Sequence, residues 1–255
     1  MSARAPARVG TGRRKTFRIV AGVLGGLAVG LSVPFAVASL VDDGQAIHRM
    51  HNLAFTALYG VLLGAALLSC ARDPERNVSA FLVAVASGIA GTIAGLASGD
   101  FISGTWFTAP ISIVILVVLH PRRAELGRWP GVDPPTAVLS VVAFVPATAW
   151  LLTQAELQRN GVAGDPHWDL HHYSGMAAAA LGLALCGLAA SLRVSGRRTG
   201  VWVVGVSALM VGGGSLLLSD HVGAFDAAWA WLTLAWGLGL VARAEMEARK
   251  ESTDR

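Results

Sequence analysis

Histidines fall in two short stretches of this chain. Three of its seven histidines, His167, His171 and His172, lie within six residues, and His48 and His51 are three residues apart. Side chains three or four residues apart lie on one face of a helix. His48 with His51, and His167 with His171, therefore face the same way if their segments are helical. Because imidazole nitrogens bind zinc, copper, iron and nickel, the spacing predicts metal-binding chemistry.

The elements that position these histidines are strongly apolar. Of 255 residues, 54% are hydrophobic and only 14% are charged, and the mean hydropathy is +0.57. A soluble domain carries about 25% charged residues, so most of this chain is expected to lie outside water. Uncharged apolar stretches of about 20 residues are typical of transmembrane helices. We predict eight spans, at residues 18–41, 51–71, 78–98, 101–119, 136–155, 173–192, 200–218 and 226–243.

Charged residues between the spans alternate in sign. Basic residues gather in the N-terminal segment, in the second, fourth and sixth loops and in the C-terminal tail, whereas aspartates gather in the loops between. Because cytoplasmic loops are rich in Lys and Arg, we predict a multi-pass protein of the inner (plasma) membrane with both termini cytoplasmic. Six of the seven histidines then lie on the outer side, and only His120 lies on the inner side.

The chain is predicted to be an internal duplication. A shift of 121 residues places His51 on His172 and Asp100 on His221. Repeats with an even number of helices run in the same direction and are related by an axis along the membrane normal. The expected fold is therefore all-α, with eight transmembrane helices in two parallel four-helix repeats. The expected units are a basic cytoplasmic tail at 1–17, repeats at 18–120 and 136–243, a cytoplasmic linker at 121–135 and a second cytoplasmic tail at 244–255.

The duplication also predicts which polar residues meet. It brings the outer ends of the second, third, sixth and seventh spans close to the repeat axis. The expected ligand is a divalent metal such as Zn, Cu or Fe, or a heme. The first candidate ligands are His51, His172 and His221, followed by His48, Asp100, His167 and His171. We expect Asp169 or Asp220 to orient an imidazole from outside the ligand set.

Other interpretations stay open beside this one. Histidine, Trp168 and Tyr173 suit a membrane interface without binding anything, and histidines also serve as pH sensors or partner contacts. The chain is alternatively a carrier for a small or lipid-like molecule, or a structural or partner-binding protein without catalysis. Charge-coupled transport is disfavoured because the spans hold no ionisable residue near the midplane. Nucleic acid is excluded as a partner because the net charge of +4 is scattered rather than gathered in a patch.

The predicted topology resembles that of heme A synthases, which are built from two tandem four-helix bundles. Gln45-Ala46-Ile47-His48-Arg49 is similar to the Glu-x-x-His-Arg motif before their second helix, with Gln45 in place of the glutamate. His171 or His172 matches the histidine that heads their sixth helix. The family's histidines in helices four and eight have no counterpart here. For a heme, His51 and His172 are the candidate axial pair, because two imidazoles at similar depth can face each other.

Two further resemblances bear on function. The chain resembles uncharacterised multi-pass membrane proteins of actinobacteria. Membrane hydrolases of the alkaline ceramidase type offer a chemical analogy, in which a metal-bound hydroxide is the nucleophile. Serines lie at a matching depth in this chain, at positions Ser98, Ser174 and Ser219. Whether the predicted site catalyses a reaction is left open.

Overall fold

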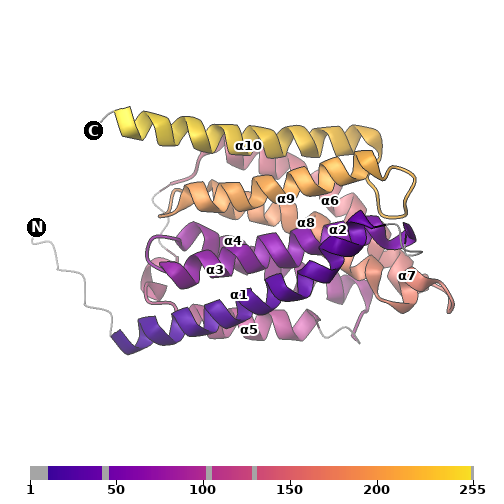
Figure 1. Cartoon of the computed structure of the whole chain (residues 1–255), viewed down its shortest axis with the longest axis horizontal. Coiled ribbons are helices and arrows are strands. Elements are labelled where there is room, and N and C mark those ends of the chain that lie inside the picture. Colours follow the sequence, from indigo (N-terminus) through magenta and orange to yellow (C-terminus); the bar gives the residue numbers. More distant parts are fainter. Residues whose placement is uncertain (1–10, 42–45, 102–104, 128–130, 254–255) are drawn as a thin grey trace, which may run out of the picture.

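The structure is a computed structural model that describes residues 11–41, 46–101, 105–127 and 131–253. Within these ranges every regular element is helical, apart from one isolated backbone bridge between Val132 and Leu192. The long helices lie side by side along the longest axis of the molecule (Figure 1). The all-α fold class predicted from the sequence is confirmed for the described residues.

The long elements follow the predicted spans in order. They are α1 Thr11–Leu40, the continuous segment of α2 Arg49–Phe55, η2 Thr56–Ala65 and α3 Ala66–Arg72, then α4 Val78–Ser98, α5 Thr105–Leu119, α6 Pro134–Asn160, α8 His172–Ser191, α9 Arg197–Leu217 and α10 Ala227–Thr253. The short elements are η1 Ala46–His48, η3 Arg123–Glu125 and α7 Pro166–Asp169. The element η2 is a π-helix, and η1 and η3 are 3-10 helices.

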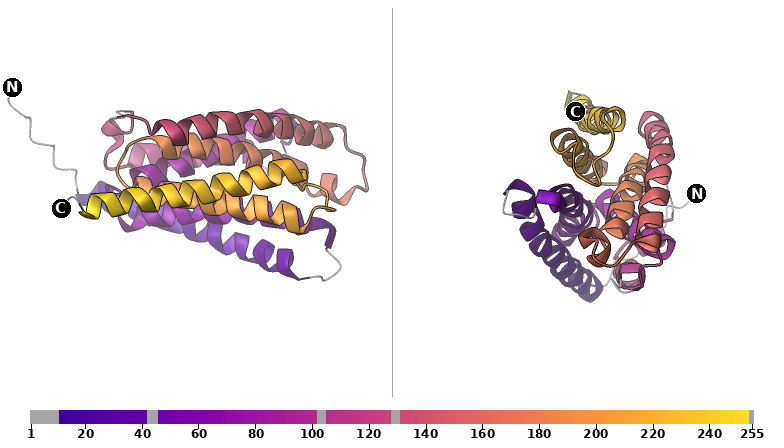
Figure 2. Two further views of the ribbon diagram at one scale, coloured as in Figure 1. Left: turned by 90° about the horizontal axis from the view of Figure 1, so that it is seen from above. Right: turned by 90° about the vertical axis from the view of Figure 1, so that its right-hand side faces the viewer.

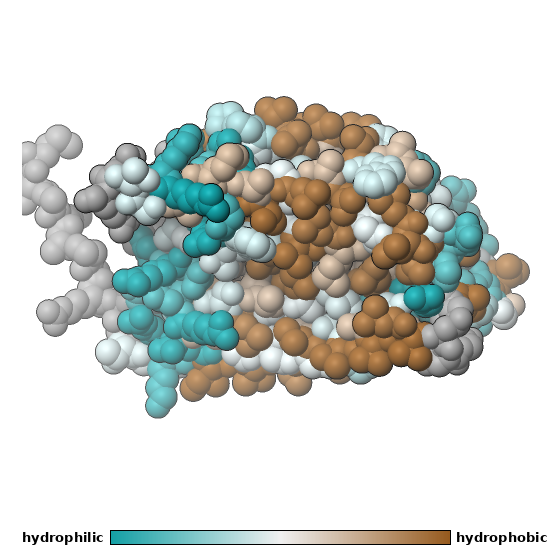
Figure 3. All heavy atoms as spheres, turned by 45° about the horizontal axis from the view of Figure 1, so that its top comes forward, coloured by the Kyte–Doolittle hydropathy of each residue, from teal (hydrophilic) through white to brown (hydrophobic). Residues whose placement is uncertain are grey.

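The surface of the bundle is that of a membrane protein. Figure 3 shows an apolar band between two hydrophilic ends. In the described residues, six helical segments are long and apolar enough to cross a membrane, namely α1, α2 to α3, α4, α6, α8 and α9. Of the other two long helices, α5 is shorter, and α10 has a charged C-terminal part. The chain is therefore an integral membrane protein, while the count of eight spans, the repeat and the orientation stay predictions.

The first and last long helices extend furthest beyond their predicted bounds, and α6 also ends at Asn160 rather than at residue 155. The helix α1 begins at Thr11 rather than at residue 18, and α10 continues to Thr253 rather than ending at residue 243. Ion pairs hold both extensions, since Arg14 lies 3.6 Å from Glu75 and Arg198 lies 2.8 Å from Glu245. Parts of both predicted tails are therefore helical. The remainder of the N-terminal tail, and Gln45 of the heme-synthase-like motif, lie outside the described residues.

The helix α8 lies at the centre of the bundle, against α4 and α6 (Figure 2). Small residues make this position possible, because they let neighbouring helices approach closely. A Cβ atom added at Gly187 would lie 2.7 Å from the Trp236 ring, and one at Gly175 would lie 2.1 Å from the Phe55 ring. Close packing therefore fixes α8, and with it His172 in its first turn.

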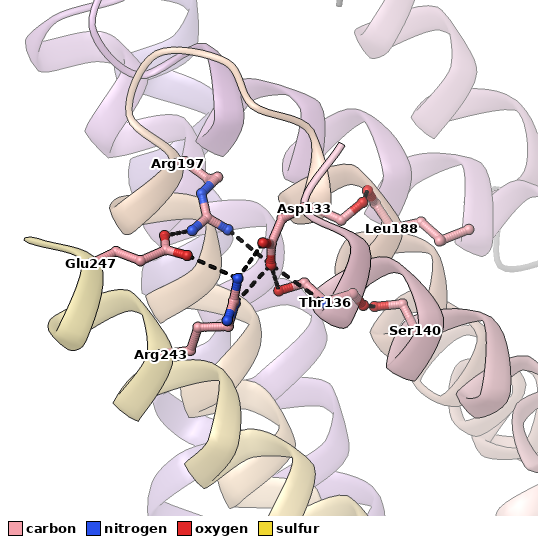
Figure 4. A network of polar contacts seen from close by, with 8 residues as sticks. Asp133, Thr136, Ser140, Leu188, Arg197, Arg243 and Glu247 are labelled. Atoms are coloured by element: carbon pink, nitrogen blue, oxygen red, sulfur yellow. Dashed lines mark hydrogen bonds and ion pairs between the residues drawn. The ribbon is translucent and has the colours of Figure 1, made fainter. Parts of the chain in front are cut away.

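A buried carboxylate ties three helices together at the end of the bundle where α10 ends (Figure 4). Asp133 caps the N-terminus of α6 and is only 1% exposed. It accepts a hydrogen bond from Arg243 Nε at 2.8 Å, and Arg197 Nη1 of α9 lies 3.5 Å away. Thr136 donates to the same carboxylate, and Glu247 pairs with both arginines. This network joins the ends of α6, α9 and α10.

We expect Asp133→Asn to lower the free energy of unfolding by about 3 kcal/mol, because removing one partner of a buried ion pair leaves uncompensated charge. Chemical unfolding of the detergent-solubilised protein measures the change. The control is Asp220→Asn, since Asp220 is exposed. An equal loss in the two variants would contradict a structural role of the network.

The network also predicts a pH dependence. Burial alone would raise the pKa of Asp133, but hydrogen bonds from Arg243 and Thr136 outweigh it and hold the pKa well below its usual range. A depressed folded-state pKa adds stability above the unfolded-state pKa of about 3.9, and this stability is lost as the pH falls toward the folded-state value. The stability difference between wild type and Asp133→Asn should stay constant from about pH 8 to about pH 5 and shrink below about pH 4.

Candidate metal centre

Four histidines meet at the opposite end of the bundle, where α7 and the start of α2 lie (Figure 1). His48 ends η1, His51 is in the first turn of α2, His167 belongs to α7, and His172 begins α8. The ring centroids of His48 and His172 are 4.7 Å apart, and those of His51 and His172 are 5.2 Å apart. His167 lies 4.6 Å from His51 and 4.8 Å from His48 by the same measure. We call these four residues the histidine cluster.

Three members of the cluster are placed to share one ion. One ligand atom from each of His48, His51 and His172 lies within 4.8 Å of the other two. All three residues are buried, and His51 is 0% exposed. Neither ring nitrogen of His51 has a hydrogen-bond partner, and nor does Nδ1 of His48 or of His172. Buried polar atoms nearly always have a partner, so these nitrogens indicate a place where a ligand would supply the missing bonds.

Helical geometry aligns the first two ligands. The chain passes directly from η1 into α2, which places His48 and His51 one turn apart on a shared side, as their spacing predicts. The π-helix η2 begins at Thr56, whose Oγ1 donates to the carbonyl of Asn52 at 2.8 Å. Such π-helical segments are rare and frequent at functional sites. The second span therefore changes from α-helical to π-helical geometry at Thr56, at the end of the short helix that carries His51.

His167 and His171 would share a face only if one helix continued through both of them, and it does not. The helix α7 ends at Asp169, and His171 has a left-handed backbone with φ 57° just before α8 begins. This conformation turns His171 away from the line of a continuous helix, and its Nδ1 lies 3.1 Å from Asp100 Oδ1. The histidine from the second stretch that joins His167 in the cluster is instead His172.

Asp165 positions His167 inside the cluster. Its Oδ1 lies 3.3 Å from Nδ1 of His167 and accepts the backbone N–H of the same residue at 2.9 Å. Its Oδ2 accepts the hydroxyl of Tyr173 at 3.0 Å. On the other side of the ring, Nε2 of His167 faces the carbonyl of Ile47 at 3.2 Å. Because both facing atoms are acceptors, both contacts are hydrogen bonds only when both ring nitrogens carry protons.

Asp165 was not among the carboxylates expected to orient an imidazole, which were Asp169 and Asp220. Asp169 instead accepts the backbone N–H of Gly164 at 3.2 Å, and Asp220 is exposed. A signal was present in the sequence, because an aspartate followed by proline is typical of a helix start. Asp165 caps α7 in this way through Oδ1, which also faces the His167 ring, and its Oδ2 is left to accept from Tyr173.

Burial and neighbouring groups shift the pKa of His48 in the cluster and of Asp165 beside it. Burial, and then the nearby charge of His167, lower the pKa of His48, which keeps its imidazole neutral and able to bind a metal. Burial would raise the pKa of Asp165, but hydrogen bonds from His167 and Tyr173 lower it further than burial raises it. A neutral imidazole at His48 thus lies beside an ionised carboxylate just outside the cluster.

The remaining predicted ligands lie outside the group of three. Asp100 pairs with His171, and Ser174 Oγ donates to Asp100 Oδ2 at 2.5 Å. His221 lies in the turn between α9 and α10, and this turn passes close to the cluster at Gly223. The roles of Asp100, His171 and His221 as metal ligands stay predictions.

Comparison with protein-family models, curated proteins and solved structures finds no match for this chain. Fold and site together define the class of protein as an all-helical integral membrane protein with a buried histidine group that could bind a metal. The resemblances to heme A synthases and to actinobacterial membrane proteins stay predictions.

The turn over His51 offers a test of the cluster's packing. Gly223 has φ +91°, and a Cβ there would lie 3.2 Å from His51 Nε2 and from Met176. Gly164 has φ +96° with nothing within 4 Å. Alanine at either position carries backbone strain of about 1–3 kcal/mol, but only Gly223→Ala presses on the cluster. We expect Gly223→Ala to lower the unfolding temperature more than Gly164→Ala does, and equal shifts would contradict the close fit.

Proposed function

We propose that this membrane protein binds one divalent transition-metal ion through His48, His51 and His172. The observation that carries the proposal is the buried group of three histidines with ligand atoms within 4.8 Å of one another. Imidazole suits zinc, copper, iron and nickel. Sites with three histidines leave a further coordination position open for water or another ligand. His167 stands beside the three as a fourth imidazole.

The packing of the rings favours an ion over a heme. A heme between His51 and His172 needs a flat slot between the two imidazoles. These rings instead stack at 5.2 Å between centroids with an interplanar angle of 28°, and His48 and His167 lie against them. A single ion needs only the space between ligand nitrogens, about 2.0–2.1 Å from each for zinc.

The carrier alternative has one observation in its favour. A cavity of about 70 Å³ lies between α6, α8 and α10, and its lining includes Trp150, Phe225, Trp229 and Trp236. Aromatic side chains also anchor and pack membrane helices. The three buried histidines are more specific evidence for a ligand than this cavity is, because packing alone does not explain buried imidazole nitrogens without hydrogen-bond partners.

Metal content is the first measurement. The full chain is purified in detergent without a histidine tag and analysed by elemental mass spectrometry, before and after exposure to Zn²⁺ or Cu²⁺. We expect about one metal ion per chain, and His51→Ala and His172→Ala should abolish this stoichiometric binding because each removes a ligand. The absorption spectrum of the Co²⁺-loaded protein then reports the coordination geometry. A folded wild type that contains no metal and takes none up would overturn the proposal.

Two variants refine the ligand set. Asp165→Asn should leave metal binding largely intact if His48, His51 and His172 suffice, because Asp165 contacts only His167 among the cluster. A loss of about 10-fold to 100-fold, as expected when the partner of a ligating imidazole is removed, would add His167 to the ligands. His221→Ala should leave binding intact if His48, His51 and His172 suffice, and loss of binding would add His221 to the ligands. Circular dichroism and elution volume must match wild type for each variant.

A further inference from the structure

A polar cavity lies next to the histidine cluster and shares a wall with it. The segment from His167 to His172 contributes to both, with His167 and His172 in the cluster and Trp168 and His171 lining the cavity. The cavity measures about 240 Å³, far more than the roughly 15 Å³ that one water needs. Its lining comes from the outer ends of α4 and α6 and from α7 and the residues beside it, and comprises Ser98, Gly99, Asp100, Phe101, Gln158, Arg159, Trp168 and His171.

Two buried polar atoms in this lining have no partner. Ser98 is 2% exposed and Gln158 is 6% exposed, yet neither Ser98 Oγ nor Gln158 Oε1 makes a hydrogen bond. The amide of Gln158 is oriented, because its Nε2 donates to the carbonyl of Trp168 at 3.2 Å. That bond leaves Oε1 as a free acceptor, while Ser98 can donate or accept. The lining therefore lacks at least one hydrogen-bond donor from a ligand.

The charges of the lining have both signs. Arg159 is exposed, and within the described residues no carboxylate forms an ion pair with it. Asp100 is 3% exposed and is held by His171 and Ser174. Arg159 and Asp100 carry opposite formal charges. A ligand with one positive and one negative group complements this arrangement better than a simple anion or cation does.

The backbone around the cavity is unusual. His171 adopts a left-handed conformation with φ 57°, whereas Gly99, with φ 62°, is an ordinary left-handed glycine that caps α4. A left-handed conformation is uncommon for a residue other than glycine. Such residues cluster at ligand sites, where the surrounding structure holds them in place. Here the left-handed turn at His171 is what points its side chain at Asp100 rather than along α8.

Apolar side chains are exposed near the same ends of α4 and α6, and one of them, Phe101, lines the cavity. Leu96 of α4, Leu157 of α6 and Phe101 are exposed by 53%, 41% and 60%. Exposed apolar side chains at the end of a membrane-spanning helix lie where the headgroups of a bilayer meet its hydrocarbon core. A polar cavity at this level is within reach of a lipid headgroup.

We propose that this cavity binds a phosphoethanolamine group, that is, a phosphate joined by a short linker to an ammonium. The phosphate faces Arg159 and Ser98, since a guanidinium binds phosphate through paired hydrogen bonds. The ammonium faces Gln158 Oε1, to which it supplies the missing donor, and lies on the side of the Asp100 carboxylate. The group belongs either to a membrane lipid or to a free solute, and the position beside exposed apolar residues favours the lipid. This site does not depend on metal in the histidine cluster.

Calorimetry tests the proposal by measuring how tightly separate probes bind to the delipidated full chain in detergent. These are phosphoethanolamine, inorganic phosphate, ethanolamine, and the short-chain lipids dihexanoyl-phosphatidylethanolamine and dihexanoyl-phosphatidylglycerol. We expect a phosphoethanolamine-bearing probe to bind at least about 10-fold more tightly than phosphate or ethanolamine alone. Binding of the lipid but not of phosphoethanolamine identifies a headgroup site, and binding of both assigns the shared group. Absence of binding by both, or equal binding of phosphatidylglycerol or of phosphate alone, overturns the proposal.

Variants assign the binding to the cavity. Arg159→Gln should weaken binding about 10-fold or more, and Ser98→Ala should weaken it less because a neutral hydrogen bond is the weaker contact. Arg193→Gln is the matched control, since Arg193 is an exposed arginine at the other end of the bundle. Unchanged binding in Arg159→Gln overturns the assignment. Metal content should be unaffected by Arg159→Gln, so this test and the test of the histidine cluster fail independently.

Discussion

Inside a bilayer, a polypeptide must satisfy its own backbone N–H and C=O groups, because hydrocarbon offers them no partners. The helical segments of this protein meet that requirement, and the apolar band between two polar ends follows from it (Figure 3). Charged side chains are costly within the band. They gather instead at the two ends, where Asp133 joins α6, α9 and α10 at one and the histidine cluster forms at the other.

The central helix α8 links packing to chemistry. Its small residues bring it against α4 and α6, and this fixed position holds His172 opposite His48 and His51. The ligand nitrogens are thus brought together by apolar packing elsewhere, and the packing offsets the cost of burying imidazoles without partners. A site prearranged in this way can bind an ion with little movement of its ligands.

One backbone conformation divides the histidine-bearing end of the bundle into two environments. The left-handed His171 interrupts the helical path between α7 and α8, so that His171 and His172 point into different surroundings. His172 enters the histidine cluster, whereas His171 meets Asp100 beside the polar cavity.

The sequence by itself determined the membrane class, the helical fold, the approximate helix positions and the alignment of His48 with His51, because hydropathy and helical spacing are local properties. Only the tertiary structure decided that His48, His51 and His172 converge while Asp100 and His171 pair elsewhere. It also decided that Asp133 joins α6, α9 and α10 at the opposite end. These outcomes depend on packing between distant segments and on one left-handed residue, which no local pattern encodes.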